Sequence, residues 1–198
     1  MSIIYETKRN ENLVSLAEDG DTILGILRDN DESNDPRGWD DLGKMVCYHK
    51  NYDLGDKHEF KTPEEFKEFI KKEKNCVYLP VYLLDHSGIT ISTTSFNDRW
   101  DSGKVGWIYA TEETIKKDQN VEEVTDEVIK KVKDIFRGEV EVYDQYLTGD
   151  VYGFSLENRN GDIIDSCGGF FGSNFEENGI KDALDDNAHL IDKLKDVN

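Results

Sequence analysis

Cysteine and proline are scarce in this sequence, and the cysteines follow no pattern that would define a site. Among the 198 residues there are three cysteines and three prolines. An odd number of cysteines, without CxxC or CxxH spacing, argues against a disulfide framework and against a structural zinc site. We therefore expect Cys47, Cys76 and Cys167 to be small residues that are buried in the fold.

Long apolar runs and nucleotide-binding loops are also absent. No run approaches the roughly 20 apolar residues that cross a bilayer, and residues 1–12 lack the basic and apolar regions of a secretory signal. We therefore expect a cytoplasmic protein that does not enter membranes. The sequence contains neither GxGxxG nor GxxxxGK[ST], so nucleotide binding by these loops has no support.

Positive charge is scarce as well. The chain has 24 Lys and Arg against 43 Asp and Glu, a net charge of −19. Residues 11–41 hold 10 acids and 2 bases, and residues 139–198 hold 14 acids and 4 bases, whereas residues 42–138 hold 18 acids and 16 bases. Such a field repels nucleic acid and acidic membranes and attracts basic surfaces. A surface that is simply very soluble accounts for the composition equally well.

Apolar residues are still frequent enough, at 36% of the chain, to build a core. Alternating or apolar runs predict strands at 3–6, 12–19, 22–29, 44–52, 75–85, 86–96, 104–111 and 151–166. The turn signals Gly20-Asp21 and Asn160-Gly161 predict hairpins. Pro80 predicts a bulge or an edge position in the strand that contains it.

Four helices are predicted between and after these strands. Thr62 followed by Pro63 opens the first, Thr111 caps a short second one, and the longest periodic segment is 124–147. A capping box of Ser173 and Glu176 predicts a final helix, with apolar residues at 180, 184, 188 and 191 facing inward.

These elements predict an α+β fold. We expect a mostly antiparallel sheet, a long core-packing helix and a C-terminal amphipathic acidic helix. We divide the chain into three segments of one compact unit. They are acidic N-terminal strands in a hairpin (1–34), an α+β core (35–172) and the acidic C-terminal helix (173–198).

Two polar loops resemble each other. Residues 35–46 and 97–106 both run Arg, Trp-Asp, Gly-Lys and then a strand. The repeat indicates turn chemistry, in which each Asp binds backbone amides and the Trp covers the end of the sheet. We therefore interpret most of this pattern as structural rather than ligand-binding.

The neighbourhood of the first loop could also hold a catalytic site. Cys47 and His49 are two residues apart on a predicted strand, roughly 6.6 Å along the backbone on the same face. A Cys nucleophile with a His base, oriented by Asp53 or Asp56, is one arrangement. His58 and His86 add further candidates, yet the spacings match no metal-binding motif. The alternative function is therefore a small hydrolase or nucleotide-processing enzyme that uses residues 47–58 and 86.

The predicted final helix carries the strongest charge pattern. Its apolar stripe is opposed by aspartates that repel one another instead of forming i,i+4 pairs. Such a face predicts a binding surface. Duplex DNA carries one negative charge per ~1.7 Å of its axis, so other acids would have to lie on the same surface to approach that charge density. The residues expected on it are Asp182, Asp185, Asp186, Asp192, Asp196, Glu139, Glu141, Asp144, Asp150, Glu176, Glu177, Asp29, Asp31 and Glu32. Trp39, Tyr143 and Tyr146 are possible anchors if exposed, although core packing fits most of them better.

Several segments together resemble a family of small proteins encoded by phages, plasmids and other mobile elements of bacteria. The resemblance covers residues 35–172, and its most specific parts are WDSGKVGWIY and YDQYLTGDVYGF. It implies a mobile-element origin rather than a reaction, and it transfers no catalytic residues. The acidic antirestriction family that mimics bent DNA is not similar to this sequence.

Charge and resemblance together predict a non-enzymatic inhibitor of a bacterial defence nuclease. We expect a protein of the anti-CRISPR or antirestriction type that occupies a basic nucleic-acid-binding surface of the nuclease in the host cytoplasm. Mimicry of DNA is one way in which it could do so. No cofactor, metal, membrane or direct nucleic-acid partner is expected.

Overall fold

The computed structural model describes residues 12–197, so the run predicted as a strand at 3–6 lies outside the described residues. The chain divides into two compact units. The terminal unit consists of residues 1–34 and 149–198, and the central unit consists of residues 35–148. The sequence predicts a single compact unit divided at residues 34 and 172, whereas here residues 149–172 group with the chain ends.

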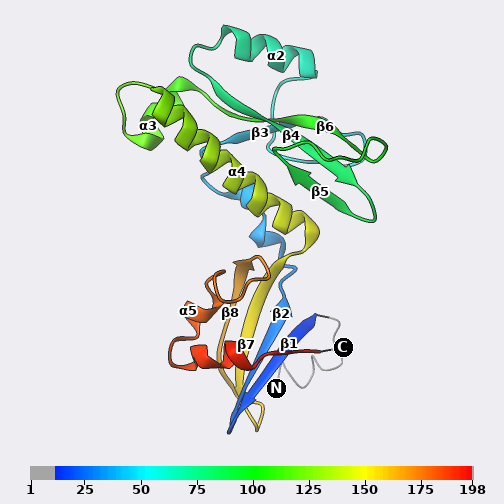
Figure 1. Ribbon diagram of the computed structural model, residues 1–198, viewed down its shortest axis with the longest axis vertical. Helices are drawn as coiled ribbons and strands as arrows, with labels where there is room; N and C mark the ends of the chain where they lie inside the picture. Colours follow the sequence, from blue (N-terminus) through cyan, green and yellow to red (C-terminus); the bar gives the residue numbers. More distant parts are fainter. Residues whose placement is uncertain (1–11, 198) are drawn as a thin grey trace. The chain divides into compact units, whose positions relative to one another are not determined.

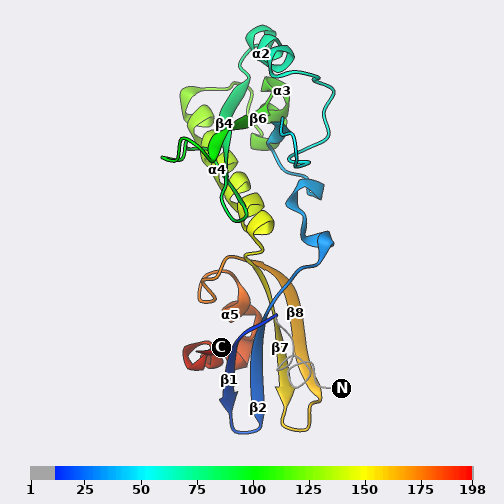
Figure 2. The ribbon, with the colours of Figure 1, turned by 90° about the vertical axis from the view of Figure 1, so that its right-hand side faces the viewer.

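The terminal unit is built on an antiparallel sheet with the strand order β8-β7-β2-β1-β9. Figure 2 shows β1, β2, β7 and β8 side by side. The strands are β1 (Leu13–Asp19), β2 (Thr22–Arg28), β7 (Val151–Asn158), β8 (Ile163–Phe171) and β9 (Lys195–Asp196). Both predicted hairpins are confirmed, and Gly20 and Gly161 adopt the positive φ of +59° and +84° that their turns require. The long-range pairing of β2 with β7 joins the two ends of the chain.

One face of this sheet packs against the C-terminal segment. Helix α5 (Ile180–Ala183) and the 3-10 helix η3 (Asp185–Lys193) place Ile180, Leu184, Leu190 and Ile191 on a core with Leu24, Ile26, Phe154 and Leu156. The predicted single α-helix with a capping box is therefore wrong in its bounds. Gly179 and Asp185 have positive φ (+100° and +48°), which interrupts a right-handed helix on either side of α5.

The central unit has a four-stranded antiparallel sheet with the order β3-β6-β4-β5. The strands are β3 (Lys44–Cys47), β4 (Val77–Asp85), β5 (Ile89–Ser92) and β6 (Ser102–Ala110). Pro80 lies on an inner strand, and the register shifts between Val81 and Tyr82, so the predicted bulge lies beside the proline. Gly106 allows close strand approach, because a Cβ there would lie 2.0 Å from the carbonyl oxygen of Val46.

Helices cover both faces of this sheet (Figure 1). They are α2 (Pro63–Lys72), α3 (Glu112–Gln119) and α4 (Asp126–Thr148), and the short 3-10 turn η2 (Pro36–Gly38) precedes β3. A second 3-10 turn, η1 (Glu32–Asn34), ends the first segment of the terminal unit. The predicted caps form, because the hydroxyls of Thr62 and Thr111 accept the N–H groups of Glu65 and Thr114. Helix α4 packs Val132, Phe136 and Val140 on one face, and α2 packs Phe66 with Val46 and Trp107 on the other. The α+β class and the long core-packing helix are confirmed.

Candidate functional site

The two acidic ends of the chain belong to the same unit. Residues 1–34 and 149–198 hold 19 Asp and Glu and 7 Lys and Arg, which is a net charge of −12 on 84 residues. Residues 35–148 hold 24 acids and 17 bases, which is −7 on 114 residues. The two units have a similar density of acids, and the terminal unit is the more negative one because it has fewer bases to offset them. Acids that are far apart in the sequence thus share a unit with little compensating positive charge, as the hypothesis of an acidic binding surface requires.

The most acidic part of this unit is the segment from Glu176 to Asp192. Its six predicted binding residues are all exposed: Glu176, Glu177, Asp182, Asp185, Asp186 and Asp192. Glu176 forms an ion pair with Lys181, whereas the four aspartates form no ion pair among the described residues. The hydrogen bond that Lys181 donates to Glu176 raises the pKa of Lys181, and the charges of Asp192 and Asp182 add to this effect. One lysine therefore offsets only part of the charge of its acidic neighbours.

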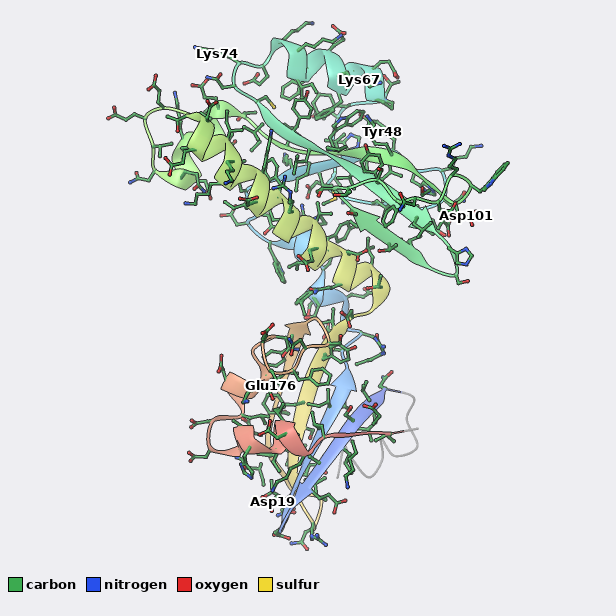
Figure 3. The ribbon with its side chains drawn as sticks, in the orientation of Figure 1. Asp19, Tyr48, Lys67, Lys74, Asp101 and Glu176 are labelled. Atoms are coloured by element: carbon green, nitrogen blue, oxygen red, sulfur yellow. The ribbon has the colours of Figure 1, made fainter. Side chains whose placement is uncertain are left out.

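The backbone before α5 is held by asparagines rather than by the predicted capping box. Asn174 Oδ1 accepts the N–H of Glu176 (3.3 Å), and Asn178 Oδ1 accepts the N–H of Ile180 (3.1 Å). Asn178 also donates to the carbonyl oxygen of Gly172 (2.7 Å). The side chains of Glu176 (labelled in Figure 3) and Glu177 are exposed, and Glu177 accepts a hydrogen bond from the side-chain amide of Asn174 (2.9 Å).

Five further predicted acids also lie in the terminal unit: Asp29, Asp31, Glu32, Asp150 and Asp196. Most of them bind groups of the fold itself. Asp29 accepts the N–H of Gly169 (2.8 Å), and Asp150 accepts the hydroxyl of Tyr152 (2.8 Å). Asp196 accepts the hydroxyl of Ser15 (3.1 Å), and the backbone N–H of Ser33 holds the pKa of Asp31 below its usual value. Their charge adds to the unit, but their first role is to fix turns and the short strand β9.

The three remaining predicted residues, Glu139, Glu141 and Asp144, lie on α4 in the central unit. Asp144 accepts the N–H of Ile91 and the hydroxyl of Thr90, both at 2.7 Å. Glu139 is half-buried and accepts backbone N–H groups from the loop before β3. Burial raises the pKa of Glu139 to about 7. We therefore correct their assignment, because Glu139 and Asp144 anchor loops and only Glu141 is exposed.

An ion cluster that the sequence did not reveal joins η3 to the β1–β2 hairpin. Asp19, at the end of β1 (Figure 3), accepts hydrogen bonds from Lys193 (2.7 Å) and His189 (3.0 Å). These bonds lower the pKa of Asp19, and the one from Lys193 contributes most. Because the partners are more than 160 residues apart, no local pattern could have indicated the contact.

The loop at residues 35–46 is organised around Arg37. Its side chain is 5% exposed, and it pairs with Asp41 and Asp56 and donates to the carbonyl oxygen of Gly43 (3.3 Å). The guanidinium also lies 5.6 Å from the ring of Tyr143, a core residue whose hydroxyl accepts the N–H of Gly55 (3.1 Å). The loop is a scaffold, as its turn chemistry predicted, and Tyr143 is not an interface anchor.

In the second polar loop, residues 97–106, an aspartate binds backbone amides as predicted, but the tryptophan does not cover the end of the sheet. Asp98 Oδ1 accepts the N–H groups of Trp100 (2.7 Å) and Asp101 (2.9 Å). Trp100 is 95% exposed and Trp39 is 49% exposed, so neither indole closes the end of the sheet. Tyr146 packs against the core of the central unit.

The Cys and His residues of the alternative enzyme do not form a catalytic arrangement. Strand β3 ends at Cys47, so His49 does not share a strand face with it. His58 contacts the carbonyl oxygen of Cys47 (3.2 Å) rather than its thiol, and His86 pairs with Asp101 (3.2 Å). Burial raises the pKa of Cys47 to about 12, which keeps it a poorly nucleophilic thiol at neutral pH.

The cysteines and the possible metal ligands do not form a further site among the described residues. Cys47 and Cys76 are half-buried, and Cys167 is exposed, which corrects the expectation that it is buried. In residues 12–197, no group of three or more His, Cys, Asp or Glu side chains is placed to hold a metal ion. The helices of this part of the chain also lack the length and apolar character of a bilayer span.

The chain matches no protein-family model, no curated protein and no solved structure. The resemblance to mobile-element proteins therefore stays a prediction.

Proposed function

We propose that this protein is a phage or mobile-element anti-defence protein, of the anti-CRISPR or antirestriction type. In this proposal the terminal unit binds a basic nucleic-acid-binding surface of a bacterial nuclease and blocks the access of nucleic acid. The protein acts by occupying that surface and needs no catalytic group of its own.

The main observation in support is the union of the two acidic chain ends in one unit of net charge −12. The exposed aspartates at 182, 185, 186 and 192 make no compensating ion pairs among the described residues. Exposed like charges of this kind destabilise the folded unit slightly, and they attract cationic partners and raise association rates. If the surface binds a cationic partner, the attraction to that partner offsets the stability that the folded unit loses to repulsion among these aspartates.

The spacing of these charges favours an irregular anionic surface over a regular copy of the DNA backbone. A 3-10 helix rises about 2 Å per residue, so three aspartates over the nine residues of η3 give one charge per about 6 Å. Duplex DNA carries one per ~1.7 Å. The neighbouring Glu176, Glu177 and Asp182 are therefore part of the proposed surface.

The experiment compares two charge-reversal variants of equal size. The test variant is Asp182→Lys, Asp185→Lys, Asp186→Lys in the terminal unit. The control is Glu122→Lys, Glu123→Lys, Glu127→Lys, three exposed positions of the central unit. Each protein is titrated against purified CRISPR effector nucleases and restriction endonucleases, and both binding and DNA cleavage are measured at several salt concentrations.

We expect the wild type and the control to inhibit a nuclease with an affinity that falls steeply with salt. The test variant should bind roughly tenfold to a hundredfold more weakly. An equal loss of affinity in both variants would show that binding depends only on the net charge of the protein. Unchanged inhibition by the test variant would exclude this surface as the binding site. Failure of the wild type to inhibit any nuclease of these classes would contradict the function itself.

A further inference from the structure

The central unit contains a long loop without regular structure between β3 and α2, residues 48–62 (the 48–62 loop). Loops of this length inside a compact unit are uncommon and usually functional. This one is held in place, because Gly55 forms an isolated bridge with Val46 and the N–H of Asp56 donates to the carbonyl oxygen of Met45 (2.8 Å). Gly55 has φ of +75°, and a Cβ there would lie 2.6 Å from that oxygen, so the return of the loop to β3 requires glycine.

The 48–62 loop and the end of β3 line an open surface cavity of about 640 Å³. Pockets of roughly 300–1,000 Å³ are typical of small-ligand sites. The lining residues are Cys47, Tyr48, His49, Lys50, Tyr52, Asp53, Leu54, Asp56, Lys57, His58, Phe60 and Lys61. Tyr48 is labelled in Figure 3 on the side of the sheet that α2 covers.

Five aromatic rings line this cavity and are only partly buried. His49 and Tyr52 stack with their centroids 4.8 Å apart, and the ring of His58 meets Tyr48 edge-on at 5.2 Å. These rings are half-buried and hold one another in place. They therefore offer flat surfaces on which a planar ligand can stack, and few side-chain rotations are lost on binding. His58 adds a polar group. Its Nε2 faces the carbonyl oxygen of Cys47, and its buried Nδ1 has no hydrogen-bond partner among the described residues.

The lining is also cationic, in contrast to the chain as a whole. Its three lysines are Lys50, Lys57 and Lys61, and none of them forms an ion pair among the described residues. The lining has two carboxylates, Asp53 and Asp56, but Asp56 pairs with Arg37. In a chain with nearly twice as many acids as bases, this local excess of unpaired positive charge predicts an anionic ligand.

We propose that this cavity binds a mononucleotide, with the base between the aromatic side chains and the phosphate among the three lysines. The proposal concerns binding alone, since burial raises the pKa of the half-buried Cys47 to about 12 and leaves its thiol poorly nucleophilic. The inference concerns the central unit and is independent of the function proposed for the terminal unit.

The test uses AMP, adenosine and inorganic phosphate as separate probes, with binding measured by calorimetry on the full chain. One variant removes the charges (Lys50→Gln, Lys57→Gln, Lys61→Gln), and its control removes three exposed lysines elsewhere in the unit (Lys117→Gln, Lys130→Gln, Lys131→Gln). A second variant, Tyr52→Leu, removes the ring that stacks on His49. Circular dichroism verifies that every variant keeps the fold.

We expect AMP to bind the wild type more tightly than either adenosine or phosphate. The lysine variant should weaken AMP roughly tenfold and leave adenosine unchanged, whereas Tyr52→Leu should weaken both AMP and adenosine. The lysine control should behave as wild type. The proposal is overturned if AMP does not saturate the wild type, if phosphate binds as tightly as AMP, or if the control loses as much affinity as the lysine variant.

Discussion

The backbone N–H of Gly43 donates a hydrogen bond of 3.0 Å to the carboxylate of Glu139, which is 96 residues away in the sequence. The N–H of Leu42 donates to the same carboxylate at 2.9 Å. These bonds fix the chain just before β3 against helix α4. The fit is close, because a Cβ at position 43 would lie 2.5 Å from Glu139 Oε2 and 2.6 Å from the side chain of Ile108.

The close contact predicts that Gly43→Ala destabilises the protein. Either the carboxylate or Ile108 must move, and overpacking of this kind costs about 1–3 kcal/mol of unfolding free energy. Gly38→Ala is the matched control, since nothing lies within 4 Å of a Cβ there. Urea unfolding of the two variants measures the difference, and equal stabilities would show that the 42–43 segment is not fixed as described.

Glu139 should also make stability depend on pH. Burial, with the nearby charge of Asp41, raises the pKa of Glu139 from 4.5 to about 7. Between these values the folded state holds a proton that the unfolded state has released, so stability falls as pH rises through this range. The change is on the order of 1–2 kcal/mol, because solvent screens part of the interaction.

Glu139→Gln removes this titration, and its urea midpoint should therefore fall less than that of the wild type between about pH 5 and pH 8. Glu141→Gln, at an exposed position of the same helix, should keep the wild-type slope. If Glu139→Gln kept it as well, the pH dependence would have to come from another group.

Arg37 should be essential for the stability of the central unit. Its removal in Arg37→Met leaves Asp41 and Asp56 without their partner in a largely buried setting, at a cost of about 3–5 kcal/mol. Arg137→Met breaks an exposed pair with Asp134 and should cost less than about 1 kcal/mol. Thermal unfolding compares the two, and similar melting temperatures would contradict the structural role of Arg37.

The three cysteines should differ in reactivity. Burial raises the pKa of Cys47 to about 12 and that of Cys76 to about 11, whereas Cys167 is exposed. Iodoacetamide at neutral pH should therefore label Cys167 first, as peptide mass spectrometry would detect. Rapid labelling of Cys47 in the folded protein would revive the hypothesis of a cysteine nucleophile.

The sequence by itself determined the elements that depend on near neighbours. Hairpins formed where glycine stands in the turn, helices began at Thr62 and Thr111, and the 124–147 periodicity became α4. Such signals are readable because a turn or cap is decided by residues within a few positions of each other. The acidic character of the chain ends was equally visible from composition.

Only the tertiary structure decided which of these charges lie in the same unit. The pairing of β2 with β7 brought the two acidic ends together, while Glu139 and Asp144 became acceptors for loops of the central unit. Positive φ at Gly179 and Asp185 divided the expected final helix. Strand pairing, burial and long-range hydrogen bonds join residues more than 50 positions apart, and their energies are set by packing, which no local pattern in the sequence contains.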